Sequence, residues 1–250
     1  MMETLRKHTL LLLGASLLAF FAGLLSTFPA SIAFEKIRAQ LPPQLTEMIS
    51  NVEGSIWNGQ STLTAELLQS RINWELNPID GLLGGYGIVL HAHHIDHDLW
   101  LKLNPSGEKS GRLQISGTIS SQLINRQLKP FSIIIDQDIE LKALTASLKD
   151  EKFSNLSGTV LWQGGRVSYT AGETQTHQLP KLEGLLSSVD GTLVLNIVKA
   201  GSSKPISLIT FQANGWLSLE VKPAMAGLIL LPNQRVNRAG NVMDIKRKLY

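Results

Sequence analysis

The sequence contains no cysteine. Disulfide frameworks, thiolate nucleophiles and cysteine-ligated zinc sites are therefore excluded together. Charged residues are also sparse, at 17% of the 250 residues, and the formal net charge is +3. Part of this positive excess lies near the chain ends, at Arg6, Lys7, Lys246, Arg247 and Lys248. Because no basic stripe runs through the middle of the chain, we do not expect a nucleic-acid-binding protein.

The motifs that mark common enzyme sites are missing as well. No serine stands in a nucleophile elbow, and no glycine-rich phosphate loop precedes a helix. The glycine-rich stretch 81–87 has neither the lysine nor the Ser/Thr hydroxyl that phosphate binding needs. We therefore predict no catalytic residue, no cofactor and no enzymatic activity.

Histidine forms one dense cluster, in the stretch HAHHIDHD at 91–98. On a continuous strand His91, His93 and His97 would share one face, and imidazoles two residues apart can ligate zinc or copper. The simpler interpretation is a solvated strand and turn whose polar face uses histidine. No second cluster completes a site, so we predict no metal. A metal-dependent periplasmic enzyme using these three histidines stays open as an alternative.

The amino-terminal segment 9–28 reads TLLLLGASLLAFFAGLLSTF and carries no charge. A helix of about 20 residues covers about 30 Å, the thickness of the hydrocarbon core of a bilayer. Arg6 and Lys7 precede it, so the positive-inside rule predicts a cytoplasmic tail at 1–8 and a body on the far side of the membrane. We expect a single-pass protein of the inner membrane with its bulk in the periplasm.

A cleaved signal peptide is the competing interpretation of this segment. Ser31, Ile32 and Ala33 have the small-x-small form of a cleavage site. The apolar run is, however, longer than the roughly 7–15 residues of a usual signal-peptide core, which favours an uncleaved anchor. Residues 29–51 then form a connecting helical segment that must break at the two prolines, Pro42 and Pro43.

From residue 52 onward the sequence alternates apolar and polar residues with period two. Such alternation sends successive side chains to opposite faces of a strand and gives a sheet one apolar face. Turn residues separate the runs, which indicates an antiparallel meander over 52–250. The stretches 80–85 and 121–128 could each be a short helix or irregular. The clearest strand runs are 61–65, 71–76, 111–119, 191–197 and 215–221.

Two stretches of the body are similar to each other: VEGSIWNG at 52–59 and LSGTVLWQG at 156–164. They suggest two related halves, 52–150 and 151–250, although two similar hairpins would look the same. The five tryptophans all fall in strand-like runs, where they could fill the core or line an interface.

Several short motifs follow one another in a distinctive order. GSIWNG at 54–59 precedes WELNP at 74–78 and LLGG at 82–85, and GTVLW at 158–162 precedes GTL at 191–193. In this order, behind an amino-terminal membrane helix, they resemble the type II secretion system protein N family. The residues expected to have structural or interaction roles are Gly54, Trp57, Gly59, Trp74, Pro78, Gly158, Trp162 and Gly191.

The resemblance implies an accessory, non-enzymatic component of the inner-membrane part of a secretion machine that exports folded proteins from the periplasm across the outer membrane. Its partners would be inner-membrane and periplasmic subunits of that machine, and the bilayer through residues 9–28. It also implies a mainly β fold, an elongated and curved antiparallel sheet beneath the anchor, similar to the AsmA-like group or to a jelly roll. The alternative function is a periplasmic module that binds or transfers lipid or glycolipid in an apolar β-groove.

Overall fold

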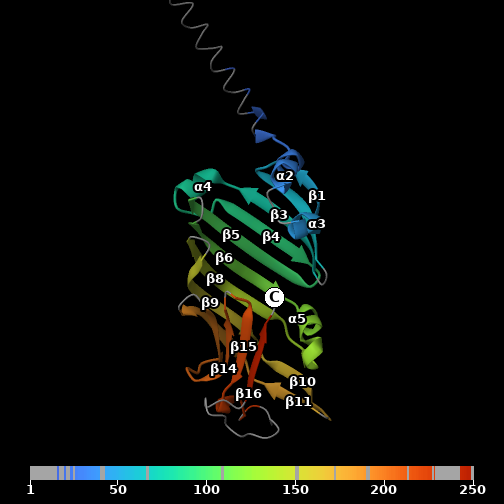
Figure 1. Cartoon of the computed structure of the whole chain (residues 1–250), viewed down its shortest axis with the longest axis vertical. Helices are drawn as coiled ribbons and strands as arrows, with labels where there is room; N and C mark the ends of the chain where they lie inside the picture. The colour runs from blue at the N-terminus through green and yellow to red at the C-terminus, as the bar shows by residue number, and fades with distance from the viewer. Residues whose placement is uncertain are drawn as a thin grey trace, which may run out of the picture. The chain divides into compact units, whose positions relative to one another are not determined.

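The computed structural model describes residues 16, 20, 23–24, 26–39, 43–65, 68–107, 110–149, 152–171, 173–189, 192–212, 214–226, 228 and 243–248. The chain divides into two compact units, residues 1–77 and 78–250. Strand is the main secondary structure of both units, as the period-two pattern predicted (Figure 1). This boundary differs from the division into halves at residue 150, which stays a prediction.

The segment 9–28 lies largely outside the described residues. Ser16, Phe20, Gly23, Leu24 and residues 26–28 are the part of it that the structure describes. Within the described part of the chain, no helix combines the length and apolar character needed to cross a bilayer.

The first unit contains two short helices before its sheet, α2 (Ala30–Arg38) and α3 (Pro43–Met48). The first residue of α3 is Pro43, and proline is tolerated there because the first helical N–H has no intrahelical partner. Lys36 and Arg38 lie in the last turn of α2, where positive charge complements the helix dipole. Both helices lie within residues 29–51, where the sequence predicted a connecting helical segment, and β1 begins at Ile49.

Three antiparallel strands complete this unit in the order β1 (Ile49–Gly54), β2 (Asn58–Ala65) and β3 (Leu68–Leu76). Helix α2 packs on β1, and α3 packs on β1 and β2. Ser61 on β2 and Ser70 on β3 are buried, and Ser70 is only 1% exposed. In the β2–β3 register they lie opposite Ile72 and Leu63, so this face mixes small and large side chains.

The second unit contains one large antiparallel sheet whose strands follow the order β4-β5-β6-β8-β9-β12-β13-β14-β15-β16, and a smaller sheet in the order β11-β10-β7. The predicted meander is confirmed, and both uncertain stretches contain helices, α4 and α5. The elements are α4 (Pro78–Leu82), β4 (Ile88–His94), β5 (His97–Gly107), β6 (Ser110–Ile119), α5 (Ser121–Leu128), η1 (Lys129–Phe131), β7 (Ile133–Ile135), β8 (Ile139–Lys149), β9 (Lys152–Trp162), β10 (Gly165–Ala171), β11 (Glu173–Leu179), β12 (Leu182–Val189), β13 (Thr192–Lys199), β14 (Pro205–Phe211), β15 (Trp216–Val221), α6 (Pro223–Ala226) and β16 (Met243–Lys248).

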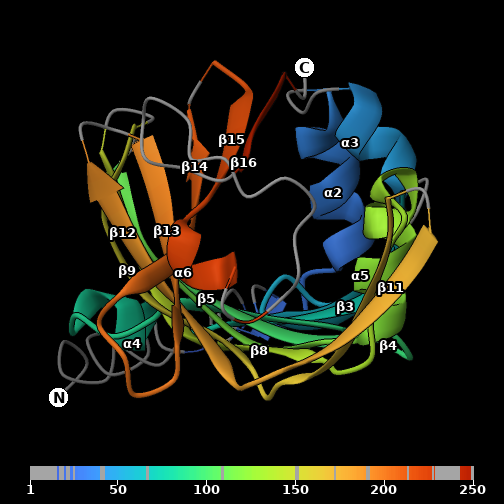
Figure 2. The same cartoon turned by 90° about the horizontal axis from the view of Figure 1, so that it is seen from below.

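The large sheet of the second unit is strongly curved. Figure 2 shows β5 and β8 across its floor, β12, β13 and β14 rising on one side, and α5 with β11 rising on the other. Register shifts interrupt the β6–β8 and β8–β9 pairs, and Ala143 in β8 has a positive φ of 47°. Such bulges bend a strand and increase its twist, so they account for the curvature in the middle of the sheet.

Candidate functional site

The sequence motif at 54–59 forms the turn between β1 and β2. Gly54 has a φ of 93°, and a Cβ at this position would lie 2.7 Å from the carbonyl oxygen of Asn58. The Ser55 hydroxyl accepts hydrogen bonds from the backbone N–H groups of Trp57 and Asn58, both at 3.2 Å. Glycine and serine are therefore required by the local geometry of a closed turn.

Trp74 packs directly on this turn. It lies opposite Gly59 in the β2–β3 register, and a Cβ on Gly59 would come within 2.3 Å of the indole ring. The Trp74 indole N–H donates to the Ser55 carbonyl oxygen at 3.1 Å, and the Leu76 N–H donates to the Trp57 carbonyl oxygen at 2.6 Å. The structure thus brings the first two sequence motifs together into one packed element.

The same turn holds the chain that follows the apolar segment 9–28. Pro29 forms an antiparallel bridge with Ser55, and the Ile56 N–H donates to the Phe28 carbonyl oxygen at 3.0 Å. Residue 28 is the last residue of the predicted membrane segment. We call residues 54–59 the signature turn; it fixes the start of α2 to the sheet of the first unit.

The later glycine–tryptophan motif has a different local structure. Gly158 lies within β9, and a Cβ there would approach the Cα of Leu144 in β8 to 2.6 Å. Trp162 ends β9, is 8% exposed and donates from its indole N–H to the Gln137 carbonyl oxygen at 3.1 Å. Both residues therefore shape the second unit, whereas Gly191 lies outside the described residues.

Pro78 begins a strongly exposed apolar turn, α4 and the residues after it. Ile79, Leu82 and Leu83 are 69%, 88% and 82% exposed. The turn is well formed, because the Leu83 N–H donates to the Ile79 carbonyl oxygen at 3.1 Å. Arg112 of β6 donates to the Gly84 carbonyl oxygen. Large apolar side chains held so far into solvent indicate a contact surface.

The histidine stretch forms the hairpin between β4 and β5, which separates the three candidate metal ligands. His91 lies opposite Trp100 and His93 opposite Asp98, whereas His97 lies opposite His94 on the other face. The shared face expected for His91, His93 and His97 was wrong because the chain reverses at 95–96, which shifts the alternation. Among the described residues, no group of three or more His, Cys, Asp or Glu side chains is placed to hold a metal.

These histidines instead have neighbours within the hairpin. The His91 Nε2 lies 2.6 Å from the Asp98 carboxylate, and its ring stacks on Trp100 with centroids 4.0 Å apart. On the other face, burial lowers the pKa of His97, and the neighbouring His94 adds to the shift. The cluster therefore favours neutral imidazole at His97 near pH 7.

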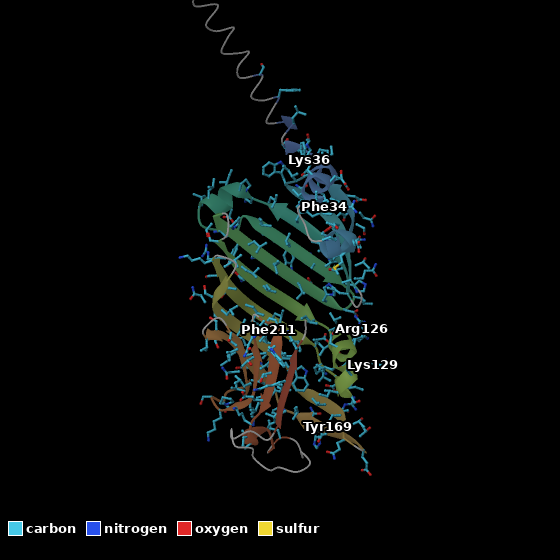
Figure 3. The ribbon with its side chains drawn as sticks, viewed as in Figure 1. Phe34, Lys36, Arg126, Lys129, Tyr169 and Phe211 are labelled. Atoms are coloured by element: carbon cyan, nitrogen blue, oxygen red, sulfur yellow. The ribbon has the colours of Figure 1, made fainter. Side chains whose placement is uncertain are left out.

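Helix α5 is tied to this hairpin and to the smaller sheet. Arg126, labelled on α5 in Figure 3, donates to the buried Asp96 carboxylate at 2.5 Å, and this hydrogen bond lowers the pKa of Asp96. The Asn125 side-chain amide makes two hydrogen bonds with the backbone of Ile135 in β7, at 2.8 and 2.9 Å. This arrangement could not be predicted from the sequence pattern, because its partners lie 10 and 30 residues apart.

One face of the large sheet, which we call the aliphatic face, is mainly aliphatic, as the alternation predicted. Opposed residues on neighbouring strands share a face, so the register defines rows that run across the sheet. Each of the residues named below is half-buried. One row crosses β4, β5, β6 and β8 at Leu90, Leu101, Ile115 and Leu144, and another crosses β12, β13, β14 and β15 at Leu186, Leu195, Ile209 and Leu219.

The opposite face has a different chemistry. The next row along the same strands places Ser187, Val194, Thr210 and Ser218 opposite one another. A polar hollow of about 440 Å³ lies on this side. It is lined by Thr210, Gln212, Asn214, Trp216, Leu217, Ser218, Glu220 and Lys246. The two faces of one sheet thus differ: the rows of the aliphatic face are leucine and isoleucine, whereas the opposite face mixes polar side chains with apolar ones that include the buried Leu161 and Val198.

A family model described as Type II secretion system (T2SS), protein N, matches residues 48–228. The matched range begins within α3, includes the signature turn and extends beyond α6. No curated protein and no solved structure matches the chain significantly.

Proposed function

We propose that this chain, which belongs to the type II secretion system protein N family, is an inner-membrane accessory subunit of that system. Membership of the family confirms the resemblance predicted from the order of the sequence motifs, and it implies an accessory role in type II secretion. In this role the chain is a structural and interaction protein. It supports the export of folded proteins from the periplasm across the outer membrane.

Membrane anchoring by residues 9–28 is one part of this proposal. The uncharged segment of about 20 residues and the preceding Arg6 and Lys7 support it. The signature turn supports it as well, because its contacts with Phe28 and Pro29 would hold the end of an anchor against a folded unit. A segment anchored in this way would set the distance of the sheet from the bilayer.

The orientation can be tested with single cysteines, because the chain has none of its own. Glu3→Cys lies in the tail before the anchor, and Gln163→Cys lies in an exposed turn of the second unit. With the outer membrane permeabilised, a membrane-impermeant maleimide should label Gln163→Cys in intact cells and Glu3→Cys only after lysis. Labelling of both or of neither before lysis would contradict a periplasmic body.

The exposed turn after Pro78 is the surface we assign to another subunit of the secretion machine. Its three large apolar side chains, at Ile79, Leu82 and Leu83, are those a partner would bury. Ile95 in the β4–β5 turn provides a matched control, because it is also 88% exposed but stands alone between polar neighbours.

A photoreactive benzophenone residue at position 82 or 95 tests this assignment in secreting cells. We expect position 82 to form an adduct with a subunit of the inner-membrane or periplasmic part of the machine, and position 95 to form little or none. Equal adducts at both positions, or no secretion subunit at position 82, would contradict the assignment. Loss of the chain should also reduce the amount of folded substrate that reaches the medium.

A further inference from the structure

Three strands of the second unit lie at the outer edge of a sheet, and their unpaired sides differ. Strand β16 ends the large sheet, and β7 and β11 are the two ends of the smaller sheet. An unpaired edge presents a row of N–H and C=O groups that can pair with another chain. Proteins commonly protect such an edge by charge, by a very short strand or by a covering element.

Two of these edges are protected. Strand β16 carries Lys246, Arg247 and Lys248, and repeated positive charge opposes pairing with another strand. Strand β7 has only three residues, and Asn125 of α5 covers it. The Ile135 N–H donates to the Asn125 side-chain oxygen at 2.9 Å, and the Asn125 amide donates to the Ile135 carbonyl oxygen at 2.8 Å. The Asn125 side chain thus takes the place of a neighbouring strand.

Strand β11 has none of these protections. It is seven residues long, and Glu173 at its first position is its one acidic residue, with no lysine or arginine beside it. Within the described residues β10 is its only strand partner, and β11 is the outermost strand of the smaller sheet (Figure 1). The described part of the chain therefore leaves one side of a full-length strand unpaired.

The register shows which backbone groups of β11 face outward. The Ile135 N–H and C=O bind Asn125, so both point away from β10, and the opposed residues Ile135 and Val167 exchange no ladder hydrogen bonds. In an antiparallel sheet such pairs alternate with hydrogen-bonded ones. Val167 therefore directs its N–H and C=O to the opposed His177 in β11.

The residues that alternate with His177 point the other way. Thr174, Thr176 and Gln178 direct their N–H and C=O groups away from β10, and the side chains of all three are exposed. The Thr176 hydroxyl lies 2.9 Å from that of Ser168 in β10, which holds its side chain over the sheet. The outer side of β11 therefore presents one donor and one acceptor from each of these three residues.

We propose that β11 pairs antiparallel with β11 of a second copy of this chain, which joins the two smaller sheets into one. Full overlap of the two strands places Thr176 opposite Thr176 of the second copy on a two-fold axis, and Thr174 opposite Gln178. All three residues with outward groups then form hydrogen-bonded pairs.

The side chains of β11 suit this pairing with itself. Opposed threonines on neighbouring strands stabilise a sheet, whereas like charges directly opposite each other destabilise it. Full overlap places Glu173 opposite Leu179 of the second copy, so the two carboxylates lie at opposite ends of the paired strands. This surface is separate from the apolar turn after Pro78 and does not depend on the secretion role proposed above.

A buried nitrogen beside this edge supports the pairing. The His177 Nε2 is buried and has no hydrogen-bond partner among the described residues. Buried polar atoms of native proteins nearly always have a partner. The proposed register places Gln175 of the second copy opposite His177. The Gln175 side-chain oxygen accepts from the Tyr169 hydroxyl at 2.7 Å, which leaves its amide N–H groups as donors for this nitrogen.

Oxidative cross-linking of single cysteines tests the register, because the chain has no cysteine of its own. Full chains with Thr176→Cys, Thr174→Cys or Gln178→Cys are oxidised with copper phenanthroline in membranes and separated on non-reducing gels. A disulfide joins Cα atoms about 4.4–6.8 Å apart, and the opposed residues of a hydrogen-bonded pair are about 5.5 Å apart. Thr176→Cys should therefore give at least about fivefold more dimer than the other two variants, whose substituted residues lie about 14 Å from their own counterparts.

A mixture of two variants tests the same register independently. Thr174→Cys and Gln178→Cys chains produced together should form the disulfide-linked dimer that neither forms alone, because each residue faces the other across the axis. Absence of a Thr176→Cys dimer, equal yields at the three positions, or no gain in the mixture would overturn the proposed pairing. A disulfide-sized product between Thr176→Cys and a different protein would also overturn it, since another occupant would then hold this edge.

Proline at position 176 tests the hydrogen bonds between the copies. Thr176→Pro removes an N–H that points outward, so the β10–β11 ladder keeps its bonds while the pairing of the copies loses donors. In a chain that also carries Thr174→Cys and Gln178→Cys, it should lower the yield of linked dimer at least about threefold. Thr176→Val keeps the N–H and is the matched control, and its yield should not change.

Thr176→Lys provides a second variant that leaves the backbone of β11 unaltered. It places two positive charges opposite each other on the axis and should lower the yield as Thr176→Pro does. A yield unchanged by both variants would overturn the proposal. Cross-linking of position 82 to a secretion subunit should persist in both variants, so loss of the dimer and failure of the proposed function are distinguished.

Discussion

The signature turn and the aliphatic face of the large sheet use apolar residues in opposite ways. In the signature turn, Trp74 fills the space above Gly59 and its indole N–H donates to the Ser55 carbonyl oxygen. On the aliphatic face, the leucine and isoleucine rows remain half-buried. The first region is closed upon itself, whereas the second offers a surface. The motif that identifies the family is therefore part of the architecture, and the surface suited to a ligand contains no motif.

Substitution of Trp162 should have the largest effect on stability and tests this difference most sharply. By register Trp162 lies on the aliphatic face, but its side chain is buried like that of a closed core. Trp162→Ala removes a buried indole and leaves the Gln137 carbonyl without its donor, and should cost about 3–5 kcal/mol of unfolding free energy. Urea denaturation of the full chain in detergent measures it. The exposed Trp216 is the control, and Trp216→Ala should cost less than about 1 kcal/mol. Equal losses of unfolding free energy for the two variants would contradict the distinction between the buried Trp162 and the exposed Trp216.

Substitution in the signature turn should have the next largest effect. Gly59→Leu forces side-chain atoms into the Trp74 ring and the Glu53 carbonyl oxygen, and should cost about 3 kcal/mol. Gly201→Ala is the control: it has a positive φ of 77° but open space around its Cβ, so it should cost about 1 kcal/mol from backbone strain alone. Limited proteolysis should show new cleavage within residues 1–77 for Gly59→Leu. An intact fragment pattern would contradict the closed turn.

Loss of the α5 link should be smaller. Arg126→Gln leaves the buried Asp96 carboxylate without its guanidinium partner, and should cost about 1–2 kcal/mol at pH 7, since Arg126 itself is partly exposed. The double variant with Asp96→Asn should recover part of that loss, because no charge then remains buried. If the double variant is no more stable than Arg126→Gln, the ion pair is not the cause.

The same hairpin should make stability depend on pH in two separate windows. The folded state lowers the pKa of His97 below its ordinary 6.5, so protonation favours the unfolded chain and stability falls as the pH drops below about 6.5. It also lowers the pKa of Asp96 below 3.8, so this contribution is present at higher pH and is lost as the pH falls below that value. His97→Gln should flatten the first window and Asp96→Asn the second. Unchanged profiles would contradict these assignments.

The smallest expected effect on stability is on the aliphatic face. Leu195→Ser removes a half-buried side chain and should cost below about 1.5 kcal/mol of unfolding free energy, measured by urea denaturation. Val194→Ser on the opposite face of the same strand should cost a similar amount. A large loss of stability for Leu195→Ser alone would mean that this face is a closed core.

The strands and their faces could be predicted from the sequence because period-two alternation is a local property. The runs 61–65 and 111–119 are in β2 and β6, and residues 80–85 and 121–128 overlap α4 and α5. The faces on which the histidines lie could not be predicted in this way, because the two-residue turn at 95–96 inverts the alternation. Lys181, Lys199 and Lys204 also gave no signal, since only the pairing of β12, β13 and β14 gathers them at one end. The positions of these histidines and lysines depend on which strands pair and in what register, and neither can be read from composition or local alternation.

The account rests on the aliphatic face of the large sheet being an open surface, and paired photo-cross-linking in living cells tests this most directly. A benzophenone residue replaces Leu195 in one variant and Val194 in the other, two neighbours that point to opposite faces of β13. The account predicts an adduct with a second molecule at position 195 and none at position 194. A cross-link within the chain alone at position 195, or equal adducts at both positions, would contradict it.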